Sequence, residues 1–427
     1  MNTDLHVEQL TTEARGIIGS AAVWEGREKD AVDGIVPKLI VEPPDTQTLA
    51  KILVWASERQ QSVLVRGGGT KITWGPVPSK LDLVLSTLHL NAVLNHRYGD
   101  LTATIEAGAT LTTVNDRLSQ HGQWIPLDPF LDNQATIGGI VATNDAGPRR
   151  HRHGSPRDLI IGVTLARVDG RCTKAGGTVV KNVAGYDLSR LLTGSFGSLA
   201  VILSASFKLA PQPHSSRTVV VKTSSLSELG KIAMALLASQ LTPTAIESQF
   251  PECLLVVRFE TIVESATNQA ERTAKLAKDL GGQSTILSGE PEETLWRAHA
   301  ARPWKKPGLV FKVSTPPADV TNTLEWISGA AEKHQVEWEA VGRAGLGVQI
   351  VRFDGDLAMQ ADLITSLRSR LKSPERGSVV LLRGQPELKQ RIDTWGPLGN
   401  VVETMRAIKQ QFDPMGILNP GRGPGNI

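Results

Sequence analysis

The chain has 427 residues, of which 40% are hydrophobic and 21% charged, a composition typical of a globular protein rather than a disordered one. Its net charge of +3 gives no overall argument for nucleic-acid binding, and its two cysteines, Cys172 and Cys253, lack the spacing of an iron–sulfur or zinc site. The length exceeds that of one ordinary core, so we expect two or three domains.

Targeting and membrane signals are weak in this sequence. Residues 1–16 are polar and acidic, without the basic-then-apolar order of a signal peptide, and no apolar run reaches the roughly 20 residues that span a bilayer. Two isolated cysteines favour a reducing compartment. We therefore expect a cytoplasmic protein without a membrane span, which would reach the inner face of a membrane only through partners.

The first predicted elements form a β-α-β unit whose second strand ends in three glycines. A helix over 46–60, which Asp45 or Thr46 can cap, separates a strand at 38–45 from a strand at 62–66. The remaining elements before residue 214 are, in order, strands at 81–87 and 101–108, a helix at 111–122, a hairpin at 158–177 with a type I′ turn at Asp169-Gly170, a helix at 185–194 and a strand at 198–211.

After about residue 214 the pattern changes to strands alternating with long amphipathic helices. This order predicts an α+β domain with one antiparallel sheet covered by helices. A last helix should break at Asp413-Pro414. The clearest strands of this half are at 253–260, 308–314, 347–353 and 377–384, and the clearest helices are at 265–282 and 356–373.

The glycines at 67–69 are the first candidate for a ligand-binding loop. Without Cβ atoms, their backbone N–H groups can approach an anion closely, and Arg66 and Lys71 flank them with positive charge. The segment fits neither the GxGxxG nor the GxxxxGK[ST] nucleotide pattern. Taken alone, it is more often a plain turn after a strand.

A second candidate lies in residues 126–147. Thr136, Ile137, Gly138 and Gly139 precede a run of small residues, so a short helix is expected to begin at the second glycine. Its N–H groups would then point at a phosphate group. A helix start built from small residues for close packing explains the same pattern equally well.

A third candidate is "GGTVVKNVAGYDLSRLLTGSFGSLAVI", residues 176–202. Lys181, Asn182, Tyr186 and Asp187 crowd a predicted loop between buried strands, which a ligand explains better than packing does. Asp187 is alternatively a plain helix cap, and Lys181 a solvated charge.

Together the three segments resemble the FAD-binding domain of the p-cresol methylhydroxylase and vanillyl-alcohol oxidase superfamily. The resemblance returns at "FDPMGILNPGR", residues 412–422, and within the superfamily residues 176–202 are most similar to the FAD-binding subunits of bacterial glycolate oxidases. It implies an α+β fold in which a two-subdomain FAD-binding domain is joined to an α+β cap domain with an antiparallel sheet. The expected divisions are a lead-in at 1–34, the FAD-binding domain at 35–213, the cap at 214–395 and a returning helix and tail at 396–427.

The resemblance also implies which residues hold FAD. The glycine loop would bind the diphosphate through its backbone, Thr136 to Gly139 would close the other side, and Asn419 would approach the isoalloxazine ring from the C-terminal tail. Further contacts are implied near the flavin end, along the continuing wall and against the adenine and ribose. The implied cofactor-binding residues are Arg66, Gly67, Gly68, Gly69, Thr70, Lys71, Pro126, Asp128, Thr136, Ile137, Gly138, Gly139, Asn144, Gly147, His153, Val201, Ile202 and Asn419.

Two departures from the family pattern qualify the resemblance. Some members attach FAD through a histidine just after the glycine loop, where this chain has Thr70, Lys71 and Ile72, so we expect non-covalent FAD. Members that oxidise 2-hydroxy acids alone often carry a metal-binding "GEHG"-like histidine pair, whereas His299 and His334 are isolated here. We therefore predict no metal site and assign no catalytic base.

Residues 149–158, "RRHRHGSPRD", are the most basic stretch of the chain. Without interleaved aromatic residues the stretch does not favour nucleic-acid binding. His151 and His153 could face a metal from one side of a strand, but no third ligand is evident. By resemblance the stretch runs beside the flavin, where its charge would stabilise anionic flavin or a carboxylate and His153 could carry a proton; a solvated loop is the alternative.

These features predict an FAD-dependent oxidoreductase that acts on CH–OH groups as the FAD-binding subunit of a glycolate oxidase-type complex. Electrons from a small 2-hydroxy acid would pass through flavin to an iron–sulfur partner subunit, because two cysteines cannot hold a cluster. A second flavoprotein subunit is also expected. The alternatives are an autonomous FAD-linked alcohol or hydroxy-acid dehydrogenase and a non-catalytic scaffold subunit.

Overall fold

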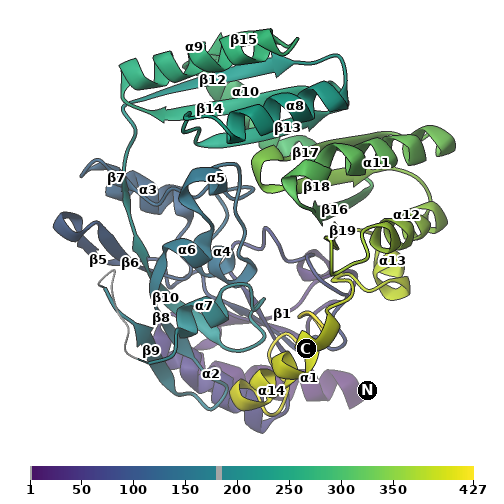
Figure 1. Cartoon of the computed structure of the whole chain (residues 1–427). Helices are drawn as coiled ribbons and strands as arrows, with labels where there is room; N and C mark the ends of the chain where they lie inside the picture. Colours follow the sequence, from purple (N-terminus) through teal and green to yellow (C-terminus); the bar gives the residue numbers. More distant parts are fainter. Residues whose placement is uncertain (1, 179–184) are drawn as a thin grey trace. The chain divides into compact units, whose positions relative to one another are not determined.

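The computed structural model describes residues 2–178 and 185–427 and divides into two compact units (Figure 1). Unit 1 comprises Met1–Ala146, Ser155–Gln212 and Leu398–Ile427, and unit 2 comprises Gly147–Gly154 and Pro213–Pro397. The eight residues 147–154, which lie in sequence within the expected FAD-binding span of 35–213, group with unit 2. No helix in the described residues is long and apolar enough to cross a membrane.

Unit 1 contains two principal sheets. The four-stranded sheet has the order β1-β2-β4-β3, with β2 and β3 both parallel to β4, and the five-stranded sheet has the order β5-β6-β10-β8-β9 and is antiparallel. The strands are β1 (Val23–Glu25), β2 (Leu39–Val41), β3 (Val63–Arg66), β4 (Leu83–Ser86), β5 (Val93–Arg97), β6 (Thr102–Glu106), β8 (Ile160–Ala166), β9 (Cys172–Gly176) and β10 (Val201–Lys208), with a separate pair of β7 (Gln123–Trp124) and β11 (Ala210–Pro211).

The helices predicted at 46–60, 111–122 and 185–194 are present in unit 1, whereas the helices at 2–18 and 156–159 were not predicted. Asp45 caps α2 by accepting the N–H of Thr48 at 2.8 Å, and Leu49, Ile52 and Leu53 bury one face of that helix. Helix α4 begins at Ile137, two residues before the predicted start. The helices are α1 (Asn2–Ile18), α2 (Thr46–Glu58), α3 (Leu111–Ser119), α4 (Ile137–Thr143), α6 (Pro156–Leu159), α7 (Leu188–Leu192) and α14 (Val402–Phe412).

The predicted β8–β9 hairpin is confirmed, but its turn differs from the prediction. Gly170 has a φ of 76°, whereas Asp169 does not adopt the positive φ that a type I′ turn also requires. The Gly170 N–H instead donates to the Arg167 carbonyl at 2.9 Å, and the Arg171 N–H donates to the Asp169 carboxylate at 3.1 Å. The hydrogen bond to the Asp169 carboxylate therefore favours a loop longer than the two residues of a type I′ turn.

Unit 2 is built on one eight-stranded antiparallel sheet, as predicted, with the order β15-β12-β14-β13-β17-β18-β16-β19. Its strands are β12 (Ser215–Lys222), β13 (Ala245–Phe250), β14 (Leu254–Thr261), β15 (Gln283–Leu287), β16 (Leu309–Ser314), β17 (Trp338–Arg343), β18 (Val348–Phe353) and β19 (Ser378–Arg383). Its helices are α5 (Arg150–His153), α8 (Leu226–Leu237), α9 (Val263–Asp279), α10 (Glu290–Ala301), α11 (Val320–His334), α12 (Leu357–Arg370) and α13 (Pro386–Arg391).

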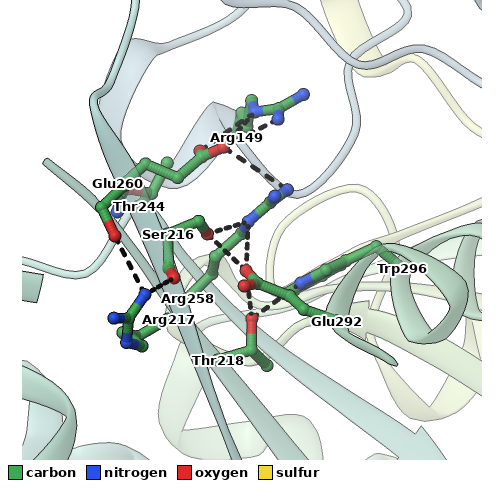
Figure 2. Close-up of polar contacts among 10 residues, drawn as sticks. Arg149, Ser216, Arg217, Thr218, Thr244, Arg258, Glu260, Glu292 and Trp296 are labelled. Atoms are coloured by element: carbon green, nitrogen blue, oxygen red, sulfur yellow. Dashed lines mark hydrogen bonds and ion pairs between the residues drawn. The ribbon is translucent and has the colours of Figure 1, made fainter. Parts of the chain in front are cut away.

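The two faces of this sheet differ in chemistry because side chains alternate along each strand. On β14, Leu255, Val257 and Phe259 enter the apolar core together with residues of α8, α9, α11 and α12. Arg258 and Glu260 alternate with them and point to the opposite face, where α10 also lies (Figures 1 and 2). The second face is therefore polar and charged.

Candidate cofactor-binding site

A groove in unit 1 lies where the loop after β3, helix α4 and the C-terminal tail meet. Its walls come from six separate chain segments, four of which the sequence analysis had singled out. The lining residues are Leu64, Val65, Arg66, Gly67, Gly68, Gly69, Thr70, Lys71, Ile72, Thr87, Ala107, Thr136, Gly138, Gly139, Ala142, Thr143, Phe196, Gly197, Ala200, Ile202, Asn419 and Arg422.

The segment before α4 lies so close to the glycines after β3 that Gly67 and Gly68 have no room for a side chain. A Cβ at Gly67 would lie 2.0 Å from Thr136 Oγ1, and one at Gly68 would lie 1.8 Å from the Gln134 carbonyl oxygen. Gly69 has a φ of 72°, which favours glycine. Within the described chain, the N–H groups of residues 67–70 have no hydrogen-bond acceptor. They form a run of backbone donors of the kind that holds phosphate groups.

The opposite wall offers fewer backbone donors than expected. The N–H groups of Ile137 and Gly138 donate to the carbonyls of Ala109 and Ala107 at 2.9 and 2.8 Å, so they are not available to an anion. The hydroxyl Oγ1 of Thr136 is buried and has no hydrogen-bond partner among the described residues. Because a buried hydroxyl without a partner is unfavourable, this atom fits a bound polar ligand.

The C-terminal tail completes the groove through a turn organised by Asp413. Its carboxylate accepts the N–H groups of Ile417 and Leu418 at 3.1 and 2.8 Å and the ammonium of Lys409 at 2.6 Å. The tail then runs beside β3, where the Val63 N–H donates to the Ile417 carbonyl at 2.8 Å. This pairing fixes the register in which Asn419 enters the groove.

Asn419 links the C-terminal tail to β3 and to Phe196 through three hydrogen bonds. Its backbone N–H donates to Val63, its Oδ1 accepts the Val65 N–H at 3.2 Å, and its Nδ2 donates to the Phe196 carbonyl. A Cβ at Gly197 would lie 2.7 Å from that Nδ2, so Gly197 leaves the room that Asn419 occupies. The predicted approach of the tail to the glycine loop is therefore explained by specific hydrogen bonds.

Arg422 binds the loop that follows the glycines. Its guanidinium donates to the carbonyls of Pro76, Ile72 and Trp74 at 2.5–2.8 Å and lies 3.5 Å from the carboxylate of Asp33. Burial lowers the pKa of this guanidinium, and Asp33 opposes that shift. One side chain thus holds the carbonyls of three alternate residues, 72, 74 and 76, of the loop.

The positive charges beside the glycine loop are paired. Lys71 is nearly buried, donates to the Phe130 carbonyl at 3.0 Å and forms an ion pair with the Asp145 carboxylate at 3.0 Å. Arg66 lies 3.6 Å from the carboxylate of Asp30. The cationic flank expected from the sequence is therefore partly neutralised within unit 1.

The structure brings most of the proposed FAD contacts to this groove and places the others elsewhere. Asn144 ends α4 with a φ of 50°, and its buried Oδ1 has no partner among the described residues. Val201 lies in the core of unit 1. Outside the lining in unit 1 are Pro126, Asp128, Ile137, Asn144 and Val201, and in unit 2 are Gly147 and His153.

The third sequence segment is described only in part. Lys181 and Asn182 lie outside the described residues. Asp187 caps α7 by accepting the Arg190 N–H at 3.1 Å, and Tyr186 is exposed. The groove residues of this segment are Phe196, Gly197, Ala200 and Ile202, of which the sequence analysis gave a role only to Ile202.

The histidines of unit 2 differ from the expectation. His151 and His153 lie on helix α5 and not on a strand, and burial lowers the pKa of each. His299 is not isolated in space, because it is buried on α10 with its Nε2 3.1 Å from Glu247 Oε2. The described residues contain no group of three or more His, Cys, Asp or Glu that could hold a metal ion.

Comparison with known proteins agrees with this geometry. Residues 37–176 match the FAD binding domain family, and residues 395–422 match the C-terminal domain of FAD linked oxidases. The second match covers Asp413, Asn419 and Arg422, the residues that complete the groove.

Similar proteins extend over nearly the whole chain. Glycolate oxidase subunit GlcD of Bacillus subtilis is 25% identical, covering 91% of this chain and 89% of that protein. D-lactate dehydrogenase of Archaeoglobus fulgidus is 28% identical, covering 90% of each. Glycolate oxidase subunit GlcE of Escherichia coli is 27% identical, covering 88% of this chain and 97% of that protein.

A solved structure of alkyldihydroxyacetonephosphate synthase shares the fold. Its TM-score is 0.71 at 16% identity, over 90% of this chain and 76% of that one. The predicted fold class, an FAD-binding domain joined to an α+β domain with an antiparallel sheet, is confirmed.

Proposed function

We propose that this FAD-dependent oxidoreductase, whose residues 37–176 and 395–422 match the FAD binding domain and FAD linked oxidase families, is the FAD-binding subunit of a glycolate oxidase-type complex. The observation that carries the proposal is the groove itself, in which unpaired N–H groups of residues 67–70 face the buried hydroxyl of Thr136. Bound FAD would supply two-electron oxidation of a CH–OH group to a carbonyl.

The residues of the groove have separate roles in holding FAD. The N–H groups of Gly67 to Thr70 would hold the diphosphate, and Thr136 would supply a hydroxyl on the other side. Asn419 ties the tail to Phe196, and Arg422 holds the loop that follows the glycines. The lining residues include no histidine, cysteine or tyrosine, which supports non-covalent attachment.

A 2-hydroxy acid is the proposed substrate class, because the similar proteins include ones named for glycolate and for D-lactate. Dependence on partners is supported by the resemblance to GlcE over 97% of its length and by the absence of a metal-type cluster in the described residues. Electrons would leave through an iron–sulfur partner, and a second flavoprotein subunit would share the substrate chemistry.

An autonomous dehydrogenase is the second candidate. It is favoured by the likeness to the archaeal D-lactate dehydrogenase, which extends over 90% of both chains. The two candidates differ in one respect that is simple to measure, namely whether the isolated chain reduces a dye with a 2-hydroxy acid as the donor.

The test begins with the visible spectrum of the purified chain before and after acid precipitation. We expect a flavin spectrum whose yellow colour moves to the supernatant. Glycolate and D-lactate are then assayed with the chain alone and with its partner subunits. Activity of the chain alone would replace the complex by the autonomous dehydrogenase. A protein that stays colourless after added FAD would leave only a scaffold role.

A further inference from the structure

Residues 147–154, here called the strap, leave unit 1 and return to it. The residues at both ends of the strap are held within unit 1. Before the strap, Asp145 binds Lys71, which lines the groove, at 3.0 Å. After it, Ser155 caps α6 by donating its N–H and hydroxyl to Asp158 at 2.8 and 2.9 Å. The strap itself packs within unit 2.

A buried ion pair holds the strap within unit 2 (Figure 2). The Arg149 guanidinium binds the Glu260 carboxylate in a fork, with Nε 3.0 Å from Oε2 and Nη2 2.8 Å from Oε1. The Glu260 side chain is 4% exposed and that of Arg149 19%. Burial alone would raise the pKa of Glu260, but Arg149 and then Arg258 outweigh it, and the pKa lies below its ordinary value.

The ion pair is one end of a charge ladder on the polar face of the sheet. Arg258 lies 3.5 Å from Glu260 and donates through Nε to Glu292 at 3.1 Å, and its guanidinium covers the ring of Trp296 at 5.4 Å. Thr218 donates to Glu292 at 2.8 Å and accepts the indole N–H of Trp296 at 2.9 Å. Arginine and glutamate thus alternate from Arg149 to Glu292, and each buried charge has an opposite neighbour.

The strap makes further contacts within unit 2, two of them with neutral groups, and the charge of Glu260 also acts on His153. Arg152 donates to the Thr242 carbonyl at 3.1 Å from an exposed position. His151 packs on Gly345, where an added Cβ would lie 2.8 Å from its ring. A forked pair between buried charges is stronger than either of these contacts.

We infer that Glu260 is a positioning residue that latches the strap to unit 2 through Arg149, and that closure of this latch is linked to FAD binding in the groove. The link runs along the chain from Arg149 to Asp145 and from there to Lys71, a groove residue. It rests on the proposed binding of FAD in that groove. If FAD favours the closed strap, the closed strap must raise FAD affinity by the same factor.

Trypsin measures the latch directly, because the strap contains three arginines. The full-length apoprotein is digested, and fragments ending at Arg149, Arg150 or Arg152 are identified by mass. We expect Glu260→Gln to be cut there at least about tenfold faster than the parent protein, because cleavage follows the population of the open strap. Glu292→Gln is the matched control, since it removes the other buried carboxylate of the ladder and leaves Arg149 paired.

Arg149→Gln gives the same test from the partly exposed side of the pair, in case Glu260→Gln does not fold. Its remaining sites at Arg150 and Arg152 should be cut as fast as in Glu260→Gln, and the double variant no faster than either. Equal cleavage of the parent protein, Glu260→Gln and Glu292→Gln would overturn the latch.

FAD titration then tests the link. We expect FAD to slow cleavage of the strap in the parent protein, and Glu260→Gln to raise the Kd for FAD by at most the factor by which FAD slows that cleavage. Cleavage of the parent protein that saturating FAD does not slow would keep the latch but overturn its link to FAD. A parent protein that binds no FAD would overturn both the link and the proposed function, while the apoprotein digest would still decide the latch.

Discussion

Replacing Arg422 by Met tests whether the C-terminal tail builds the FAD groove. The change removes donors to the carbonyls of Pro76, Ile72 and Trp74 and leaves Asp33 buried beside an apolar side chain. Breaking a buried charged pair costs about 3–5 kcal/mol. For a unit of this size, that loss corresponds to a fall in Tm of about 6–20 °C.

FAD affinity should fall together with stability, because the loop that Arg422 holds continues directly from Gly69 to Ile72. Thermal unfolding of the apoprotein gives the first quantity, and titration with FAD followed by flavin fluorescence gives the second. Arg171→Met, at an exposed arginine in the same unit, is the control and should change Tm by less than about 1 °C. An Arg422→Met protein with the parent Tm and Kd would refute the reasoning.

Further predictions concern the groove and the acid stability of unit 2. Gly68→Ala should abolish measurable FAD binding, because its Cβ would lie 1.8 Å from the Gln134 carbonyl, whereas Gly99→Ala, which lies outside the groove with nothing within 4 Å of its Cβ, should retain it; equilibrium dialysis compares them. Thr136→Val should leave Tm unchanged or higher and weaken FAD binding several-fold, since its hydroxyl has no partner among the described residues; calorimetry measures both. The pKa of Glu260 is lowered in the folded protein, so its stabilisation is present above pH of about 4.3 and lost as pH falls below that value; Glu260→Gln should flatten this part of the Tm profile in scanning fluorimetry.

The fold was predictable where local signals agree with tertiary packing. The cap at Asp45 and the apolar spacing of α2 both follow from short-range chemistry, and so does the break after α14 at Asp413. The start of α4 was placed two residues late because its first N–H groups bond across to Ala107 and Ala109. Those acceptors are some 30 residues earlier in the sequence, so local pattern could not indicate them.

The glycines of the groove were predictable from the sequence, whereas the residues that hold its walls in place were less so. Gly67 and Gly68 belong to a glycine run that is visible in the sequence, and a Cβ on either would clash with Thr136 Oγ1 or the Gln134 carbonyl oxygen. Arg422 lies in a sequence motif that the analysis quoted, but its three carbonyl partners lie more than 340 residues away. Every residue carries a backbone carbonyl, so residue identity does not show which carbonyls accept a hydrogen bond. The role of Arg422 is therefore visible only in the folded chain.

The basic stretch at residues 149–158 shows that charged residues in a sequence do not by themselves give a binding site that charge. Its arginines and histidines predicted a positive field for flavin or a carboxylate, yet Glu260, more than 100 residues later, neutralises Arg149 through a fork of hydrogen bonds. Burial lowers the pKa of His151 and His153, so both rings favour the neutral form. A charged residue that is already paired in a buried site fixes the position of its segment more than it adds to the local electrostatic field. The stretch is therefore better understood as a segment held in place by unit 2 than as a reservoir of positive charge.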